Sequence, residues 1–323
     1  GATDRVADLD TEVPGYSYDG AATSGGSASV KQLLGLGDPV FNARLSPSST
    51  RAVPTVTDDS ASVGTLYLHP YKGNRIALYN TTDSAWEMHE MSGAVSKVLS
   101  SLTSGRGYDV FVYDNAGTLT LEFVVWSSGT ARATALATQD GIYVKTGDAS
   151  RRYVGSFYSV STSATAWITS NTTASGKLLI WNYYNRIQTS SKVRETTTSW
   201  TYGTATWRYM NNDSANRIEI FVGVQEEHYD VQASAGMNLN NTTANTGIGL
   251  DASTSPLTTG HRFGGYGTDQ TQSSNSALVR DQTAIGFHYY AAIEQASFGT
   301  TTFWGNYTTS PLTQAGIMLS GAM

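Results

Sequence analysis

The sequence predicts an all-β protein with two β-sandwich or jelly-roll-like domains preceded by an extended N-terminal arm. Only 14 % of its 323 residues are charged, against about a quarter in ordinary soluble chains, and 43 Thr, 37 Ser and 32 Gly take their place. The chain also holds 19 Tyr, 9 Phe and 7 Trp, which supply large side chains for a core. Short alternating segments separated by Gly, Asn and Asp recur along it, which is typical of β-strands and turns.

The same composition excludes several classes of protein. The aromatic content argues against disorder, and no stretch reaches the roughly 18 apolar residues of a membrane span, so we expect no membrane insertion. A net charge of −6 with scattered Lys and Arg argues against nucleic-acid binding. The absence of Cys excludes disulfides, Cys-ligated zinc and a thiol nucleophile. No basic segment followed by an apolar one opens the chain, so no secretory signal is expected.

Residues 1–38 are predicted to form the attachment arm. Residues 20–29 are small and polar, as in a flexible linker. Residues 30–34 have the composition of a single helical turn that ends at Gly35, and a run this short needs tertiary support. An arm of this kind either frays or is ordered by a partner.

Residues 39–187 are predicted to form the first β-sandwich domain. Residues 108–113 and 118–126 make its clearest hairpin, because the turn at 114–117 contains Asn and Gly, which adopt positive φ angles at low cost. Residues 93–104 have apolar residues at helical spacing, yet their Val and Ser content fits a strand equally well. The other strands expected here are 65–69, 75–79, 85–90, 141–145, 151–157 and 177–186.

Residues 188–309 are predicted to form the second domain, followed by a tail at 310–323. The boundary is placed at 188–195, which are polar and show no periodicity. Residues 238–245 and 264–275 have the composition of exposed loops. No repeat of fixed period is present, which argues against a propeller or β-solenoid. The expected strands are 199–202, 206–209, 217–225, 229–235, 246–250 and 284–293, with a terminal hairpin over 298–307.

Acidic residues are the first candidates for catalysis, because two carboxylates about 5–10 Å apart can hydrolyse a glycoside. Asp114 lies in a turn, where Asp is favoured for local hydrogen bonding, while Glu122 and Glu219 alternate with apolar neighbours, as solvent-facing strand residues do. We therefore expect structural or solvated roles and no enzymatic activity. The candidates are Asp109, Asp114, Glu122, Glu219, Glu226, Glu227 and Glu294.

Metal and cofactor sites are not expected. The five His residues, at positions 69, 89, 228, 261 and 288, match no metal-binding spacing. Glu226, Glu227 and His228 are adjacent, but neighbouring residues of a strand point to opposite faces. The chain contains neither a Gly-x-Ser-x-Gly nucleophile motif nor a phosphate-binding glycine loop.

Aromatic residues in polar surroundings are candidates for sugar contacts, since a pyranose face packs against an aromatic ring. Tyr266 lies in the run Gly-Gly-Tyr-Gly, and Trp304 and Tyr307 flank Gly305 and Asn306. These three residues are the predicted glycan contacts, while most other aromatic residues are expected in the core or in contacts between subunits.

The first half carries a resemblance to a known family. The segments GNRIALY at 73–79, YDVFVYDNAGTL at 108–119, RATALA at 132–137 and WNYYNR at 181–186 resemble a module of structural proteins from tailed-bacteriophage virions, of the tail or head fibre or spike type. The resemblance covers residues 40–187. It is weaker in the second half, where it rests on residues 199–202 and 205–208.

The resemblance implies a component of the virion surface that assembles as a homo-oligomer. A trimer is favoured for a fibre, with a pentamer as the alternative at a capsid vertex. The arm is expected to dock on capsid, portal, tail or spike-base proteins. It would become ordered, and lose conformational entropy, only on assembly. The second domain would then face the host and its surface polysaccharide. No catalytic residue of the family is carried over.

Three other functions stay open. A non-viral carbohydrate-binding module or adhesin would bind glycan as an isolated monomer. A capsid decoration (cement) protein would differ from a fibre only in where the arm docks. A polysaccharide-degrading enzyme would lose activity when one particular carboxylate is neutralised, and the lack of a convincing acid pair weighs against it.

Overall fold

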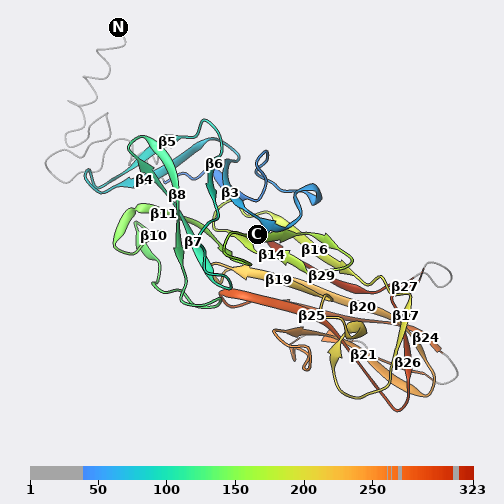
Figure 1. Cartoon of the computed structure of the whole chain (residues 1–323). Helices are drawn as coiled ribbons and strands as arrows, with labels where there is room; N and C mark the ends of the chain where they lie inside the picture. Colours follow the sequence, from blue (N-terminus) through green and yellow to red (C-terminus); the bar gives the residue numbers. More distant parts are fainter. Residues whose placement is uncertain (1–38, 260, 263, 268–270, 308–312) are drawn as a thin grey trace, which may run out of the picture.

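The computed structural model describes residues 39–323 except 260, 263, 268–270 and 308–312; the predicted arm, with its helical turn at 30–34, lies outside these residues. The all-β prediction is confirmed. Within the described residues the only helical elements are two 3-10 turns, η1 (Val56–Asp58) and η2 (Met210–Asn212). None of the described helices has the length and apolar character that crossing a membrane requires. Figure 1 shows an elongated body with the first-half strands at one end and β21, β24 and β26 at the other.

The first half of the chain forms two sheets and a separate hairpin. The three-stranded sheet contains β1 (Ala43–Ser46), β3 (Thr65–Pro70) and β6 (Val95–Val98). The six-stranded sheet contains β8 (Thr118–Val125), β7 (Gly107–Asn115), β11 (Asp148–Tyr158), β10 (Ile142–Lys145), β9 (Ala137–Gln139) and β15 (Ile180–Asn182). The hairpin consists of β4 (Arg75–Asn80) and β5 (Ala85–Glu90). For residues 93–104 the sequence left helix and strand open, and the structure shows a strand there, β6.

The predicted hairpin of β7 and β8 is present, with one change in its turn. Asn115 pairs with Thr118, so the loop consists of two residues, Ala116 and Gly117. Their φ angles of 49° and 88° are both positive, as the right-handed twist of a two-residue hairpin demands. The residue that shares the turn with glycine is therefore Ala116 rather than Asn115.

The second half is built around two eight-stranded sheets that lie face to face. One contains β2 (Ser60–Val63), β12 (Thr165–Ile168), β14 (Gly176–Leu178), β19 (Arg217–Val222), β25 (Gly286–Ser297), β21 (Thr242–Leu250), β23 (Gly264–Gly267) and β18 (Arg208–Tyr209). The other contains β13 (Ser170–Asn171), β16 (Gln188–Arg194), β29 (Gly316–Ala322), β20 (Tyr229–Leu239), β24 (Thr271–Asp281), β22 (His261–Arg262), β17 (Ser199–Tyr202) and β26 (Thr301–Trp304). A short ribbon joins β27 (Asn306–Tyr307) to β28 (Thr313–Gln314).

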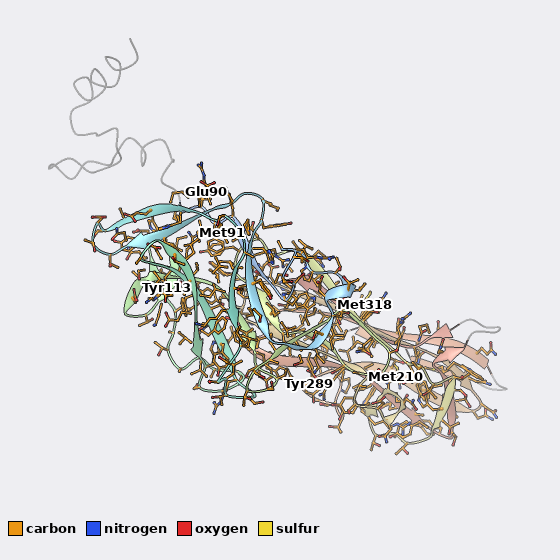
Figure 2. All side chains as sticks on the ribbon, turned by 45° about the horizontal axis from the view of Figure 1, so that its top comes forward. Glu90, Met91, Tyr113, Met210, Tyr289 and Met318 are labelled. Carbon is orange, nitrogen blue, oxygen red and sulfur yellow. The ribbon has the colours of Figure 1, made fainter. Side chains whose placement is uncertain are left out.

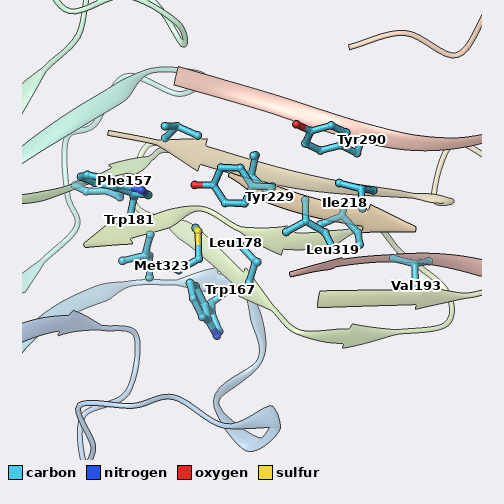
Figure 3. Close-up of a cluster of buried hydrophobic side chains, with 14 of the residues drawn as sticks. Phe157, Trp167, Leu178, Trp181, Val193, Ile218, Tyr229, Tyr290, Leu319 and Met323 are labelled. Atoms are coloured by element: carbon cyan, nitrogen blue, oxygen red, sulfur yellow. The ribbon is translucent and has the colours of Figure 1, made fainter. Parts of the chain in front are cut away.

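The core of the sandwich comes from the inward-facing residues of these strands. Ile218, Tyr229, Tyr290 and Leu319 are completely buried, and Figure 3 shows them between the two layers. In the first part of β20, buried residues alternate with exposed ones, because side chains of a strand alternate between the two faces of a sheet.

Strands from both halves share one sheet and one core. β14 from the first half pairs in parallel with β19 from the second, so backbone hydrogen bonds cross the boundary predicted at residues 187 and 188. A single cluster of buried apolar side chains extends from Phe41 to Met323. The two predicted domain ranges therefore meet inside a continuous sheet.

Polar segments predicted as loops are strands instead. Within residues 238–245, β20 runs to Leu239 and β21 starts at Thr242, and Asn241 turns the chain with a φ of 53°. Within residues 264–275, the chain forms β23 and the start of β24. The prediction was wrong because the polar side chains are paired inside the sandwich. The Thr242 and Thr301 hydroxyls are 2.8 Å apart, and the Asn275 amide donates to the carbonyl of Ala244.

Two further differences concern the C-terminal part of the chain. The hairpin predicted over 298–307 is absent, because β26 pairs with β17 and β20, and β27 pairs with β28. Residues 316–322, placed by the sequence in a tail, form β29 in the middle of a sheet between β16 and β20.

Candidate functional site

The predicted sugar-contact residues lie on two different sheets. Tyr266 lies in β23, opposite Thr243, whereas Trp304 is half-buried in β26, opposite Gly236 of β20. Tyr307 lies in the short ribbon, opposite Thr313. The side chains of Tyr266 and Tyr307 lie outside the described part of the structure. The glycan contacts assigned to these residues therefore stay predictions.

Next to Trp304, the aromatic residues serve the core. Phe303 is completely buried and stacks on Trp200, with ring centroids 5.7 Å apart and ring planes only 5° from parallel. The Trp200 indole nitrogen donates a 2.8 Å hydrogen bond to the carboxylate of Glu294. This part of the sandwich thus holds an aromatic pair and a carboxylate in one fixed cluster.

Glu294 is completely buried in β25 and is held by residues of two other strands. Its register partner Arg208, on β18, donates to it at 2.9 Å, and the Arg208 guanidinium lies over the Tyr202 ring. Burial raises the pKa of Glu294 even though Trp200 and Arg208 stabilise its charge. The carboxylate is enclosed by its partners and forms a cross-strand brace.

Glu219 is also buried, and the prediction of a solvent-facing Glu219 was wrong. It accepts hydrogen bonds from Lys177, its register partner on β14, from Arg217 at 2.9 Å and from Ser175 at 3.1 Å. These partners compensate the free-energy cost of burying the Glu219 charge. The alternation of polar and apolar residues along the strand does not reveal such partners.

Asp109 is the centre of a third buried network. Both of its oxygens accept hydrogen bonds from Arg132, at 2.8 and 2.9 Å, and Ser156 donates at 2.8 Å. Burial opposes the charge of Arg132, yet the hydrogen bonds to Asp109 raise the pKa of Arg132. Arg132 also donates to the carbonyl of Gly223, so the pair links β7 to the chain that follows β19.

The remaining acidic candidates lie nearer the surface. Glu122 pairs with Lys145 at 2.5 Å and with Arg151 at 3.0 Å. The Arg151 guanidinium lies over the ring of Tyr113, which is labelled in Figure 2. Arg186 pairs with both Glu226 and Glu227. Asp114 lines a polar cavity of about 190 Å³ together with Glu87 and His89. Among the described residues, no group of three or more His, Asp or Glu is arranged to hold a metal ion.

A larger cavity, of about 360 Å³, lies where the two halves meet. It is lined mainly by apolar residues, including Leu136, Tyr143, Val224 and Ile285. Its charged group, Arg132, already donates hydrogen bonds to the carboxylate of Asp109 and the carbonyl of Gly223. The cavity therefore presents no free charge to a ligand.

The outer face of the sheet around β29 is open and regular. Along β16 the exposed residues Ser190, Lys192 and Arg194 alternate with buried Ser191 and Val193. The register aligns them with outward residues of the next three strands in three rows. The rows are Ser190–Ser320–Asp230–Arg280, Lys192–Met318–Gln232–Leu278 and Arg194–Gly316–Ser234–Ser276.

A shallow groove of about 210 Å³ crosses this face. Gly316 has no side chain between Arg194 and Ser234, so the third row is open at its centre. We call this feature the basic groove and define it by Lys192, Arg194, Gln232, Ser234, Gln314, Gly316 and Met318. Met318, labelled in Figure 2, is 44 % exposed on its edge.

The basic groove carries positive charge that the protein leaves uncompensated. Neither Lys192 nor Arg194 has an ion-pair partner among the described residues. Both side chains are exposed. In a chain of net charge −6, such cations attract an anionic ligand.

The sequence alone does not reveal this groove, because residues 188–195 are polar and are predicted as a boundary between domains. A period of two was present in that segment, since Ser191 and Val193 face inward, but Ser191 is polar and hides the alternation. Ser191 is satisfied by donating to the carbonyl of Ile168 at 2.9 Å.

No protein-family model and no curated protein matches this chain. Among solved structures, the chain is similar to the tryptic core of a Cry1Da variant from Bacillus thuringiensis, with 7 % sequence identity and a TM-score of 0.17. The match covers 81 % of this chain and 48 % of that one, so the chain spans about half the length of the matched structure. A TM-score this low carries no conclusion on fold or function.

Proposed function

We propose that the protein is a structural component of a tailed-bacteriophage virion, a fibre or spike that docks through residues 1–38 and presents its β-sandwich to the host surface. The resemblance of residues 40–187 to such proteins supports this family of functions. The all-β body, with its long paired strands, suits a rigid part that is assembled in copies.

One observation carries the proposal of a non-catalytic role. The buried carboxylates Asp109, Glu219 and Glu294 are each held by an Arg or Lys and by a further donor. A general acid or nucleophile must reach a substrate, whereas these groups are saturated by hydrogen bonds from their own sheets. Their arrangement supports a role in bracing the fold.

The homo-oligomer, with a trimer favoured over a pentamer, belongs to the same proposal. Light scattering of the purified full chain at micromolar concentration tests it, and we expect a stable oligomer. A stable monomer would count against a fibre or spike.

The proposal of an attachment arm is tested by deleting residues 1–38. Arg152 donates hydrogen bonds to the carbonyls of Pro39, Val40 and Ala77. These bonds hold residues 39 and 40 in place, and the deletion does not remove them. We expect the truncated chain to keep its circular dichroism and melting temperature but to be lost from purified particles. Incorporation at the level of the full chain would refute the role of the arm.

A second candidate is a non-viral carbohydrate-binding module or adhesin, which the basic groove favours. It predicts glycan binding by a monomer that associates with no particle. A capsid decoration protein instead shares the arm and differs in its docking site, which electron microscopy of labelled particles distinguishes. An enzyme acting on polysaccharide predicts released reducing ends, measurable on the same samples.

A further inference from the structure

We infer that the basic groove binds an acidic polysaccharide whose negative charge is carried by carboxylates. The inference names a ligand class for the host-facing role proposed above and rests on that role. It places the contact on the face of β16, β29 and β20. Tyr266 lies on the other sheet, whereas Trp304 and Tyr307 lie on β26 and β27, which pair with β20 and with the strand of Gln314.

The spacing of the two cations fits a polymer with repeated charges. Lys192 and Arg194 are two residues apart on β16, so both project from the outer face with roughly 6.6 Å between their positions along the strand. The Arg194 guanidinium is a planar fork that matches a carboxylate, and the Lys192 ammonium adds a second point of charge. Since neither is paired with another residue that the structure describes, their charges are available to a ligand.

The other groove residues supply the contacts that a sugar needs. Gln232 and Ser234 bring an amide and a hydroxyl, which donate and accept hydrogen bonds as sugar hydroxyls require. Met318, with its exposed and adaptable thioether, offers an apolar surface for the face of a ring. Gln314 is fixed by donating to the carbonyls of Glu195 and Ala315, which holds one wall of the groove in place.

The charge and size of the groove favour a polysaccharide over a second copy of the chain. The outward residues of the three rows include three cations, Lys192, Arg194 and Arg280, and one carboxylate, Asp230, which suits an anion. Only Met318 and Leu278 are large apolar residues there, whereas the core of a stable interface is mostly apolar over about 800 Å² per partner. At about 210 Å³ the groove is smaller than the pockets that enclose drug-sized ligands, and a polymer that touches it unit by unit is the better fit.

The test measures binding of the purified full chain to polygalacturonate by calorimetry. Dextran serves as the uncharged control and polyphosphate as an anion without carboxylates. We expect binding to polygalacturonate that weakens as salt is raised, no binding to dextran and weaker binding to polyphosphate. The double variant Lys192→Gln/Arg194→Gln should lose about tenfold or more in affinity, because charge-assisted hydrogen bonds are lost.

A matched control removes two charges elsewhere. Arg75→Gln/Lys97→Gln changes two exposed cations of the first half and should bind like the unmodified chain. Met318→Glu places a negative charge at the groove edge without touching the core, and it should weaken binding as well.

Three kinds of result would overturn the inference. The first is no binding to polygalacturonate, or equal losses in the groove and control variants. The second is equal or tighter binding to polyphosphate, which would mean attraction to any polyanion. The third is a changed oligomeric state of the groove variant, which would make the face a contact between copies. These outcomes leave particle incorporation untouched, so they are separate from failure of the virion proposal.

Discussion

At the scale of single residues, the acidic side chains that first suggest chemistry act as braces between strands. Glu219 and Glu294 each face a basic register partner on the neighbouring strand, Lys177 and Arg208. Such buried pairs add little stability relative to apolar residues, but breaking one is costly because it leaves a charge without a partner. Their loss should therefore be measurable as instability.

Arg132 provides the sharpest case. In Arg132→Ala the buried carboxylate of Asp109 loses its bidentate partner, and the Gly223 carbonyl loses a donor. We expect the free energy of unfolding to fall by about 3 kcal/mol. Urea denaturation followed by tryptophan fluorescence measures the change.

The matched control is Arg280→Ala. Arg280 lies 4.0 Å from Asp230, and their side chains are 70 % and 51 % exposed. Its removal should change stability by less than about 0.5 kcal/mol. Equal effects of the two variants would contradict the structural role assigned to Arg132.

His288 introduces a dependence of stability on pH. Burial lowers its pKa, but the hydrogen bond from its ring to Asp251, 2.7 Å long, outweighs burial and raises the pKa above its ordinary value of 6.5. The charged ring is thus favoured in the folded protein. Its stabilising contribution is complete below pH 6.5 and is lost as the pH rises through the higher folded pKa.

We therefore expect the free energy of unfolding to decrease as the pH is raised above 6.5, and Asp251→Asn to flatten that part of the profile. Denaturation at a series of pH values measures the slope, and NMR titration of His288 measures the pKa itself. An unshifted titration of His288 would contradict the prediction.

At the scale of elements, local pairing was predictable and distant pairing was not. The β7–β8 and β4–β5 hairpins follow from alternation on the two sides of a short turn, within about 20 residues of sequence. The end of β20 and the start of β21, within residues 238–245, were missed because their Asn and Thr residues resemble a loop until their partners in the sandwich are known. The basic groove was missed for the same reason, since β16 meets β29 only in the folded sheet.

A substitution at Gly316 tests whether the close approach of β29 to β16 constrains the sheet. The φ of Gly316 is +155°, and a Cβ there would lie 2.2 Å from the carbonyl oxygen of Val193 on β16. Gly316→Ala should therefore disturb the β16–β29 pairing and lower stability by about 1–3 kcal/mol. Thermal denaturation measures the loss.

Gly93→Ala is the control, because a Cβ at Gly93 meets nothing within 4 Å. It should leave the melting temperature nearly unchanged. If both substitutions are harmless, the close approach of β16 and β29 at Gly316 is not a constraint on the sheet.

At the scale of the whole molecule, the shared sheet predicts one folding unit. β2, β12 and β14 of the first half extend the sheet of β19 and β25, and the core is continuous. Calorimetry of the full chain should give a single transition, with calorimetric and van't Hoff enthalpies that agree. Residues 39–187 expressed alone should not fold, because β14 would lose its partner β19. Two separate transitions, or a folded fragment, would instead support the two independent domains that the sequence suggests.

The central place of β29 bears on how the chain is made. A ribosome releases β16 and β20 well before β29, the strand that must lie between them. Until β29 emerges, the edges of β16 and β20 that it will pair with expose free backbone amides and carbonyls. These groups can pair with a neighbouring nascent chain instead. Crowding of several nascent copies would then favour aggregation over correct insertion, and slow translation between β20 and β29 would increase that exposure.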